Sequence, residues 1–246
     1  LPVAAPVEGD RESVATESTS DPTVTGALSE FRSKSLLRTH GMEFSEEVIL
    51  TTLHDAVEAA ARMTYPVVLK ASGAGIWHKS EQRLVELNIR DERDLRTSWE
   101  RLHERLSSLQ NVAVEGILLS PYVGDGVDVI VGFTRDSEFG LLCVLGPGGI
   151  FAELFGADGM RHLTLPISRD EVEQALNTGP LGKLLDGYRG GEKCDRCALL
   201  RYILEASRVA LELGSRLVEL DLNPVRVRTR ERGAVALDAL CVFGKT

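Results

Sequence analysis

The sequence has no apolar run that approaches the roughly 20 residues needed to cross a bilayer. Its opening residues, LPVAAPVEGD, have neither the basic nor the apolar region of a secretory signal. Basic residues are outnumbered as well: 28 Lys and Arg stand against 37 Asp and Glu, a formal net charge of −9, and they form no basic stripe. Neither a nucleic acid nor a membrane is therefore expected as a partner.

Cysteine is scarce, with four residues in 246. Cys143 and Cys241 lie in apolar, strand-like runs and are interpreted as small core residues, so no disulfide framework is expected. Cys194 and Cys197 form a single CxxC, but zinc needs four ligands, and neither a second CxxC nor a histidine pair accompanies it. A reducing, cytoplasmic location fits these observations best.

The amino-terminal stretch, residues 1–26, has few large apolar residues and is rich in Pro, Ser, Thr, Glu and Asp. Such a composition buries too little surface to offset the entropy of ordering the chain. We expect a disordered acidic linker that joined an upstream domain. The remaining residues are enough for one large domain or two small lobes.

Periodic patterns beyond this stretch predict helices and strands in mixed order. Helices are expected at residues 27–40, 52–63, 91–110, 169–177 and 197–213, and strands at 67–70, 117–122, 127–134, 141–145, 150–154, 217–221, 225–228 and 235–238. Apolar residues from Leu95 to Leu106 share one helical face, and Ser168 with Glu171 forms a capping box. Several strands are hairpin-linked, which favours α+β lobes over a doubly wound parallel sheet.

Two basic segments are candidates for phosphate chemistry. Lys70 ends the apolar strand PVVLK, where a lysine can reach phosphate oxygens; a solvated lysine at a strand end is the alternative. His78 follows eight residues later, next to Lys79. A neutral imidazole can accept and return a phosphoryl group, although a lone histidine can equally be structural.

Two further segments are candidates for binding anions and metal. Gly146-Pro147-Gly148-Gly149, with Glu153 beyond, could bring backbone N–H groups to an anion or could form a tight turn. Glu219, Asp221 and Asn223 occupy alternate positions and therefore share one strand face, and Asp238 returns on a neighbouring strand. Oxygen ligands on adjacent strands suit Mg²⁺ that also binds phosphates; an exposed acidic sheet face is the alternative.

Taken in order, several segments over residues 28–243 resemble the ATP-grasp domain of ADP-forming acetate/acyl-CoA synthetases. They are YPVVLK, IWHKSE, GVDVIVGFTRDSEFG, LGPGGIFAEL, GYRG, ELDLNPV and ALDA. The resemblance implies an α+β ATP-grasp fold with a nucleotide cleft between an amino-terminal lobe at 27–120 and a carboxy-terminal lobe at 121–246. It also implies a partner, a CoA-binding and CoA-ligase subunit or domain that handles CoA and a small carboxylic acid. We expect an oligomer.

The same resemblance implies roles for individual residues with ATP or ADP and Mg²⁺ as cofactors. The residues implied to bind nucleotide are Lys70, Lys79, Arg83, Gly148, Gly149 and Glu153. Asn223 and Asp238 would hold Mg²⁺, Asp221 would lie beside the phosphoryl path, and His78 would relay or orient the phosphoryl group.

The sequence departs from the family pattern in three places. One is a small insertion after Glu153, so the arginine that the family has there is either Arg161 or missing. Gln82-Arg83-Leu84 replace the glycines that usually follow HKS, so side chains are expected to obstruct backbone approach to phosphate unless the Arg83 guanidinium binds it instead. Ser120 and Pro121 replace polar residues of the hinge strand. These departures keep open a degenerate ATP-grasp module with a regulatory or assembly role. A carboxylate–amine ligase of the same superfold is less favoured, because HKS and GYRG point to the CoA branch.

Overall fold

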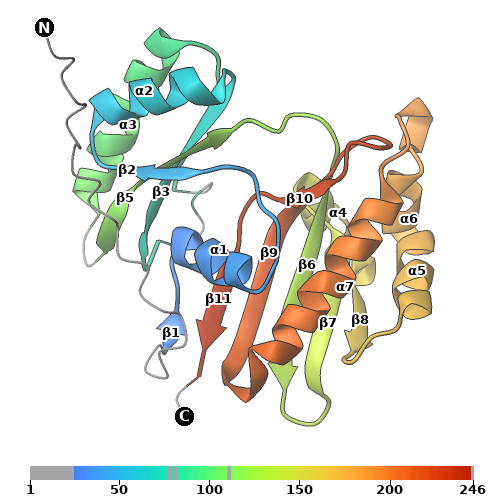
Figure 1. Ribbon diagram of the computed structural model, residues 1–246. Coiled ribbons are helices and arrows are strands. Elements are labelled where there is room, and N and C mark those ends of the chain that lie inside the picture. The colour runs from blue at the N-terminus through green and yellow to red at the C-terminus, as the bar shows by residue number, and fades with distance from the viewer. Residues whose placement is uncertain (1–24, 77–78, 80–81, 110–111, 245–246) are drawn as a thin grey trace, which may run out of the picture.

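The computed structural model describes residues 25–76, 79, 82–109 and 112–244, which form two sheets with helices packed against them (Figure 1). The helices are α1 (Glu30–Thr39), α2 (Leu53–Met63), α3 (Glu92–Ser108), α4 (Ile150–Phe155), α5 (Arg169–Asn177), α6 (Gly179–Leu185) and α7 (Arg196–Glu212). The strands are β1 (Gly26–Ala27), β2 (Val48–Leu50), β3 (Val67–Ala74), β4 (Val85–Ile89), β5 (Ala113–Pro121), β6 (Val127–Asp136), β7 (Gly140–Pro147), β8 (Arg161–Thr164), β9 (Leu217–Val227), β10 (Ala234–Ala236) and β11 (Leu240–Phe243).

The smaller lobe is an antiparallel sheet in the order β2-β5-β3-β4, covered by α2 and α3. Helix α3 buries Leu95, Trp99, Leu102 and Leu106 against this sheet, as its periodicity predicts. Burial of these large side chains stabilises the lobe. Strand β4 pairs antiparallel with β3, the strand that precedes it in the sequence.

The larger lobe is built on the order β1-β11-β9-β6-β7-β8, with β10 also paired to β9. Helices α5, α6 and α7 lie on one side of it (Figure 1). On β6, Val129, Val131 and Phe133 face these helices and are almost fully buried. Because side chains alternate along a strand, the intervening β6 residues face the opposite side. The predicted capping box of α5 is present.

The segment that contains α1 packs with the larger lobe, although it precedes the smaller one in the sequence. Strand β1 pairs with β11, and Leu36, Leu37 and Met42 are part of the larger lobe's core. The expected boundary, with residues 27–120 in the amino-terminal lobe, therefore differs from the packing of this segment. Nearly all of the expected linker lies outside the described residues.

Three expected strands differ from the structure. Residues 150–154 form the helix α4, because Gly149 adopts a left-handed φ of 57° and the chain leaves the sheet; a short apolar run does not distinguish helix from strand. Residues 217–221 and 225–228 belong largely to the single strand β9, which runs through Pro224. The pairing of β9 with β6 shifts register there, and proline is tolerated at such irregularities. Among the described residues, no helix is long and apolar enough to cross a membrane.

Candidate nucleotide and metal site

Three lysine ammonium groups converge on the carboxylate of Glu30, in the first turn of α1. Lys34 Nζ donates to Glu30 Oε1 at 2.6 Å and Lys70 Nζ donates to the same oxygen at 2.9 Å. Lys79 Nζ donates to the other oxygen, Oε2. The Glu30 side chain is fully buried, whereas those of Lys70 and Lys79 retain 12% and 11% exposure. We call Glu30 and these three lysines the lysine cluster.

The lysine cluster spans the junction of the two lobes. Lys70 lies on β3 and Lys79 follows that strand, both in the smaller lobe. Lys70 Nζ also donates to the Leu237 carbonyl at 2.5 Å, and Lys79 Nζ lies 3.2 Å from Asp238 Oδ2. Leu237 and Asp238 lie between β10 and β11 of the larger lobe. The structure therefore brings Lys70, Lys79 and Asp238 together from distant parts of the sequence.

Charges within the lysine cluster favour the ionised forms of Glu30 and Lys70. Burial by itself would raise the pKa of Glu30, but the charges of Lys70, Lys79 and Lys34 outweigh burial and hold that pKa well below its usual range. Burial would likewise lower the pKa of Lys70, but Glu30 and Asp238 raise it above its usual value. The ammonium groups of Lys70 and Lys79 are thus held at the lobe junction.

An acidic face lies on β9, on the side of the sheet away from the helices. Glu219, Asp221 and Asn223 line one pocket of about 230 Å³ together with Gly132 of β6, so the predicted common face is confirmed. Burial, followed by the charge of Glu219, raises the pKa of Asp221 to about 6, and Asp238 adds to the shift. The Asn223 amide opposes it through a hydrogen bond.

The residues of this face fit a divalent cation that also binds phosphate. Asn223 and Asp238 offer oxygen ligands, which Mg²⁺ prefers. Burial, together with the charges of Glu219 and Asp238, raises the pKa of Asp221, and a nearby cation would favour its charged form. Within the described residues, no group of three or more His, Cys, Asp or Glu could hold a metal ion. An ion here would accordingly need phosphate oxygens or water to complete its coordination, as Mg²⁺ usually does.

Gln82-Arg83-Leu84, just before β4, include one glycine-like backbone conformation although none of the three is glycine. Arg83 adopts a left-handed φ of 56°, and its carbonyl accepts a hydrogen bond from Arg105 of α3 at 2.6 Å. The Leu84 side chain is fully buried in the core of the smaller lobe, so it is not the obstacle to phosphate that the sequence suggested. The Arg83 side chain is exposed. His78 lies outside the described residues.

The glycine segment before α4 packs against the neighbouring strand. The Gly148 N–H donates to the Asp128 carbonyl at 2.7 Å, and a Cβ on Gly148 would lie 3.0 Å from the Asp128 carbonyl carbon. This close approach explains why Gly148 has no side chain. Glu153 is exposed on α4. The contacts of the described residues do not connect Gly148, Gly149 or Glu153 to the lysine cluster, so their role at phosphate stays a prediction.

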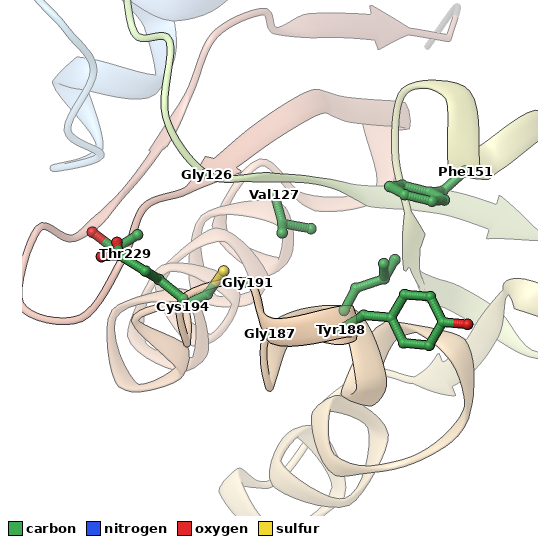
Figure 2. A pocket seen from close by; sticks show the side chains of 10 residues that line it. Gly126, Val127, Phe151, Gly187, Tyr188, Gly191, Cys194 and Thr229 are labelled. Carbon is green, nitrogen blue, oxygen red and sulfur yellow. The ribbon is translucent and has the colours of Figure 1, made fainter.

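A pocket of about 370 Å³ lies on the helix side of the larger sheet (Figure 2). Val127 at the start of β6, Phe151 of α4, Tyr188 and Cys194 contribute to its walls. Val127 and the acidic pocket's Gly132 occupy odd and even positions of the same strand, so the two pockets open on opposite faces. Cys194 is buried and Cys197 exposed, both as free thiols.

Sequence reasoning missed two residues of the lysine cluster, Glu30 and Lys34, and the buried carboxylate of Glu47 behind them. Glu30 and Lys34 are four residues apart on a predicted helix, a spacing typical of a solvated surface ion pair. Glu47 is buried beside them and pairs with Lys34 at 2.9 Å and with Arg38 at 3.1 Å. Only the acid–lysine spacing was visible in the sequence, and it does not reveal burial.

The comparisons with known proteins agree with this architecture. A family model described as an ATP-grasp domain matches residues 22–242, and the chain belongs to that family. Within it, the chain is homologous to the β subunits of ADP-forming acetate–CoA ligases. That of Pyrococcus furiosus acetate–CoA ligase II is 33% identical over 218 residues, which cover 88% of this chain and 92% of the relative. The expected α+β ATP-grasp fold is thereby confirmed.

Longer relatives and solved structures show the same relationship. The Archaeoglobus fulgidus ADP-forming acetate–CoA ligase II is 36% identical over 218 residues, 89% of this chain but 30% of the relative. A crystal structure from Pyrococcus horikoshii superposes with a TM-score of 0.82 at 31% identity, covering 90% of this chain and 93% of that one. The Candidatus Korarchaeum cryptofilum acetyl-CoA synthetase 1, in complex with coenzyme A and Ca-AMPCP, superposes with a TM-score of 0.81 at 29% identity. The match covers 89% of this chain and 93% of that one.

Proposed function

We propose that the chain is the nucleotide-binding, phosphoryl-transferring part of an ADP-forming acyl-CoA synthetase. The observation that carries this proposal is the meeting of Lys70 and Lys79 with Asp238 at the lobe junction. Two lysines next to a metal site with oxygen ligands form an environment for a polyphosphate with its bound cation. A related synthetase was solved with a nucleotide analogue and a divalent cation, which supports the same use of this cleft.

Each residue has a defined role in this proposal. Lys70 and Lys79 bind phosphate oxygens of ATP or ADP and neutralise their charge. Asn223 and Asp238 hold Mg²⁺, which would add Lewis-acid stabilisation of the transferring phosphoryl group. The Asp221 carboxyl would lie beside the phosphoryl path. His78 keeps its predicted role of relaying or orienting the phosphoryl group.

The proposal includes a partner and a cellular location. Some relatives are separate β subunits, whereas in the one-chain enzyme of Archaeoglobus fulgidus the matched region is 30% of the length. We infer a CoA-binding and CoA-ligase subunit or domain, through which CoA and a small carboxylic acid enter the reaction, and an oligomeric assembly. The four free thiols support a cytoplasmic location.

Calorimetric titration with MgADP and MgATP tests the nucleotide function. We expect saturable binding of both nucleotides, and weaker binding when EDTA removes the metal. A folded protein that binds neither nucleotide would contradict the proposal and favour the degenerate module. Arg83 and Pro121 motivate that alternative from the sequence. The Leu84 side chain is buried in the core of the smaller lobe and does not add to it.

A further inference from the structure

Glu30 is the one carboxylate that contacts all three lysines of the lysine cluster, within the described part of the chain. It belongs to α1 of the larger lobe, whereas Lys70 and Lys79 belong to the smaller lobe. Its two oxygens are divided between them, with Oε1 bound to Lys70 and Oε2 to Lys79. We propose that Glu30 is a positioning residue: from its buried position it holds the ammonium groups of Lys70 and Lys79, which bind phosphate. This inference rests on the proposed nucleotide function.

The exposures of the side chains show which lysines are available to a ligand. Glu30 is fully buried and Lys34 retains 4% exposure, while Lys70 and Lys79 retain 12% and 11%. Lys34 Nζ donates to Glu30, to Glu47 and to the Leu237 carbonyl, which uses all three of its N–H groups. Lys34 is therefore a structural member of the cluster, and Lys70 and Lys79 are the members that face outward.

Positioning and simple charge balance predict opposite effects when Glu30 is neutralised. Glu30 is an anion beneath the proposed phosphate site, so its Coulomb effect alone weakens the binding of a polyphosphate. If charge were its only contribution, removing that charge would tighten nucleotide binding. If Glu30 holds the ammonium groups in place, its removal leaves three mutually repelling lysines, and phosphate binding weakens.

Glu30→Gln provides this test because glutamine keeps the shape of the side chain. Its amide nitrogen is a donor and would face a lysine ammonium group, which is also a donor, so one lysine loses its anchor. Glu47→Gln is the matched control. Glu47 is also a buried carboxylate, with 3% exposure, and it pairs with Lys34 and Arg38. Its loss disturbs the same network without removing a contact of Lys70 or Lys79.

The measurement is calorimetric affinity for MgADP and for adenosine, which has no phosphates, on the full chain after each variant is shown to be folded. We expect Glu30→Gln to weaken MgADP binding at least about ten-fold more than it weakens adenosine binding. Glu47→Gln should leave the ratio of the two affinities within about two-fold of the wild-type ratio. Glu30→Asp keeps the charge but is one methylene shorter, so it too should lower the ratio. This second variant decides the question if Glu30→Gln does not fold.

The possible outcomes separate this inference from the proposed function. A wild-type chain that binds MgADP, with Glu30→Gln binding as well or more tightly, would overturn the positioning role and leave the nucleotide function intact. Equal losses in Glu30→Gln and Glu47→Gln would reduce Glu30 to a structural member of the network and also overturn it. A wild-type chain that does not bind MgADP would overturn both.

Discussion

Replacing Arg83 by glycine should stabilise the protein although it removes a side chain. Arg83 adopts a φ of 56°, in the left-handed region where a Cβ costs about 1–2 kcal/mol. Glycine avoids this cost but adds about 0.5–1 kcal/mol of backbone entropy to the unfolded chain. The expected net gain is therefore about 0.5–1 kcal/mol in the free energy of unfolding. For a chain of this size, that gain corresponds to an increase of roughly 1–4 °C in Tm.

Arg83→Ala is the matched control, because it removes the guanidinium but keeps a Cβ at the same φ. Calorimetric melting of the wild type and both variants should show a gain for Arg83→Gly alone. Leu84 is left unchanged, because it is fully buried and removing such a side chain costs on the order of 2–5 kcal/mol, which would mask the effect of the loop. Equal melting temperatures for the glycine and alanine variants would refute the conformational reasoning.

The same two variants report on phosphate binding at this loop. If the Arg83 guanidinium binds phosphate, both variants should lose MgADP affinity to a similar extent, because both lack the charged donor. If backbone access limits binding, only the glycine variant should gain affinity. Titration of all three proteins with MgADP distinguishes these cases. Unchanged affinity in both variants would show that Arg83 takes no part in nucleotide binding, against its predicted role.

Two further predictions concern the metal ligand and the thiols. Asp238→Asn should weaken nucleotide affinity on the order of ten-fold in Mg²⁺, because it removes a carboxylate that binds the metal. In EDTA the affinity should be unchanged or tighter, because an anion near the phosphates is gone. Equal losses in both buffers would argue against metal ligation. Cys197 should react with Ellman's reagent at pH 8 in the native protein, whereas Cys143 and Cys241 should react only after unfolding, because burial raises the pKa of both thiols to about 12. Rapid reaction of more than two native thiols would contradict this packing.

Local patterns in the sequence determined much of the fold. The apolar spacing from Leu95 to Leu106 defined the buried face of α3, because helical periodicity alone brings those positions together. Ser168 and Glu171 marked the start of α5, since a capping box involves only neighbouring residues. Alternation along β9 likewise placed Glu219, Asp221 and Asn223 on a common face.

Only the tertiary structure decided which charged groups are buried and which residues they contact. Glu30 lies 40 residues from Lys70, and Lys70 lies 167 residues from Leu237, so no local period relates these residues. Residues 150–154 became helix rather than strand, and Leu84 turned into the core, for the same reason: each outcome depends on packing against distant segments. The free energy of burying a charge depends on the partners that surround it, and those partners are specified by the fold and not by sequence neighbours.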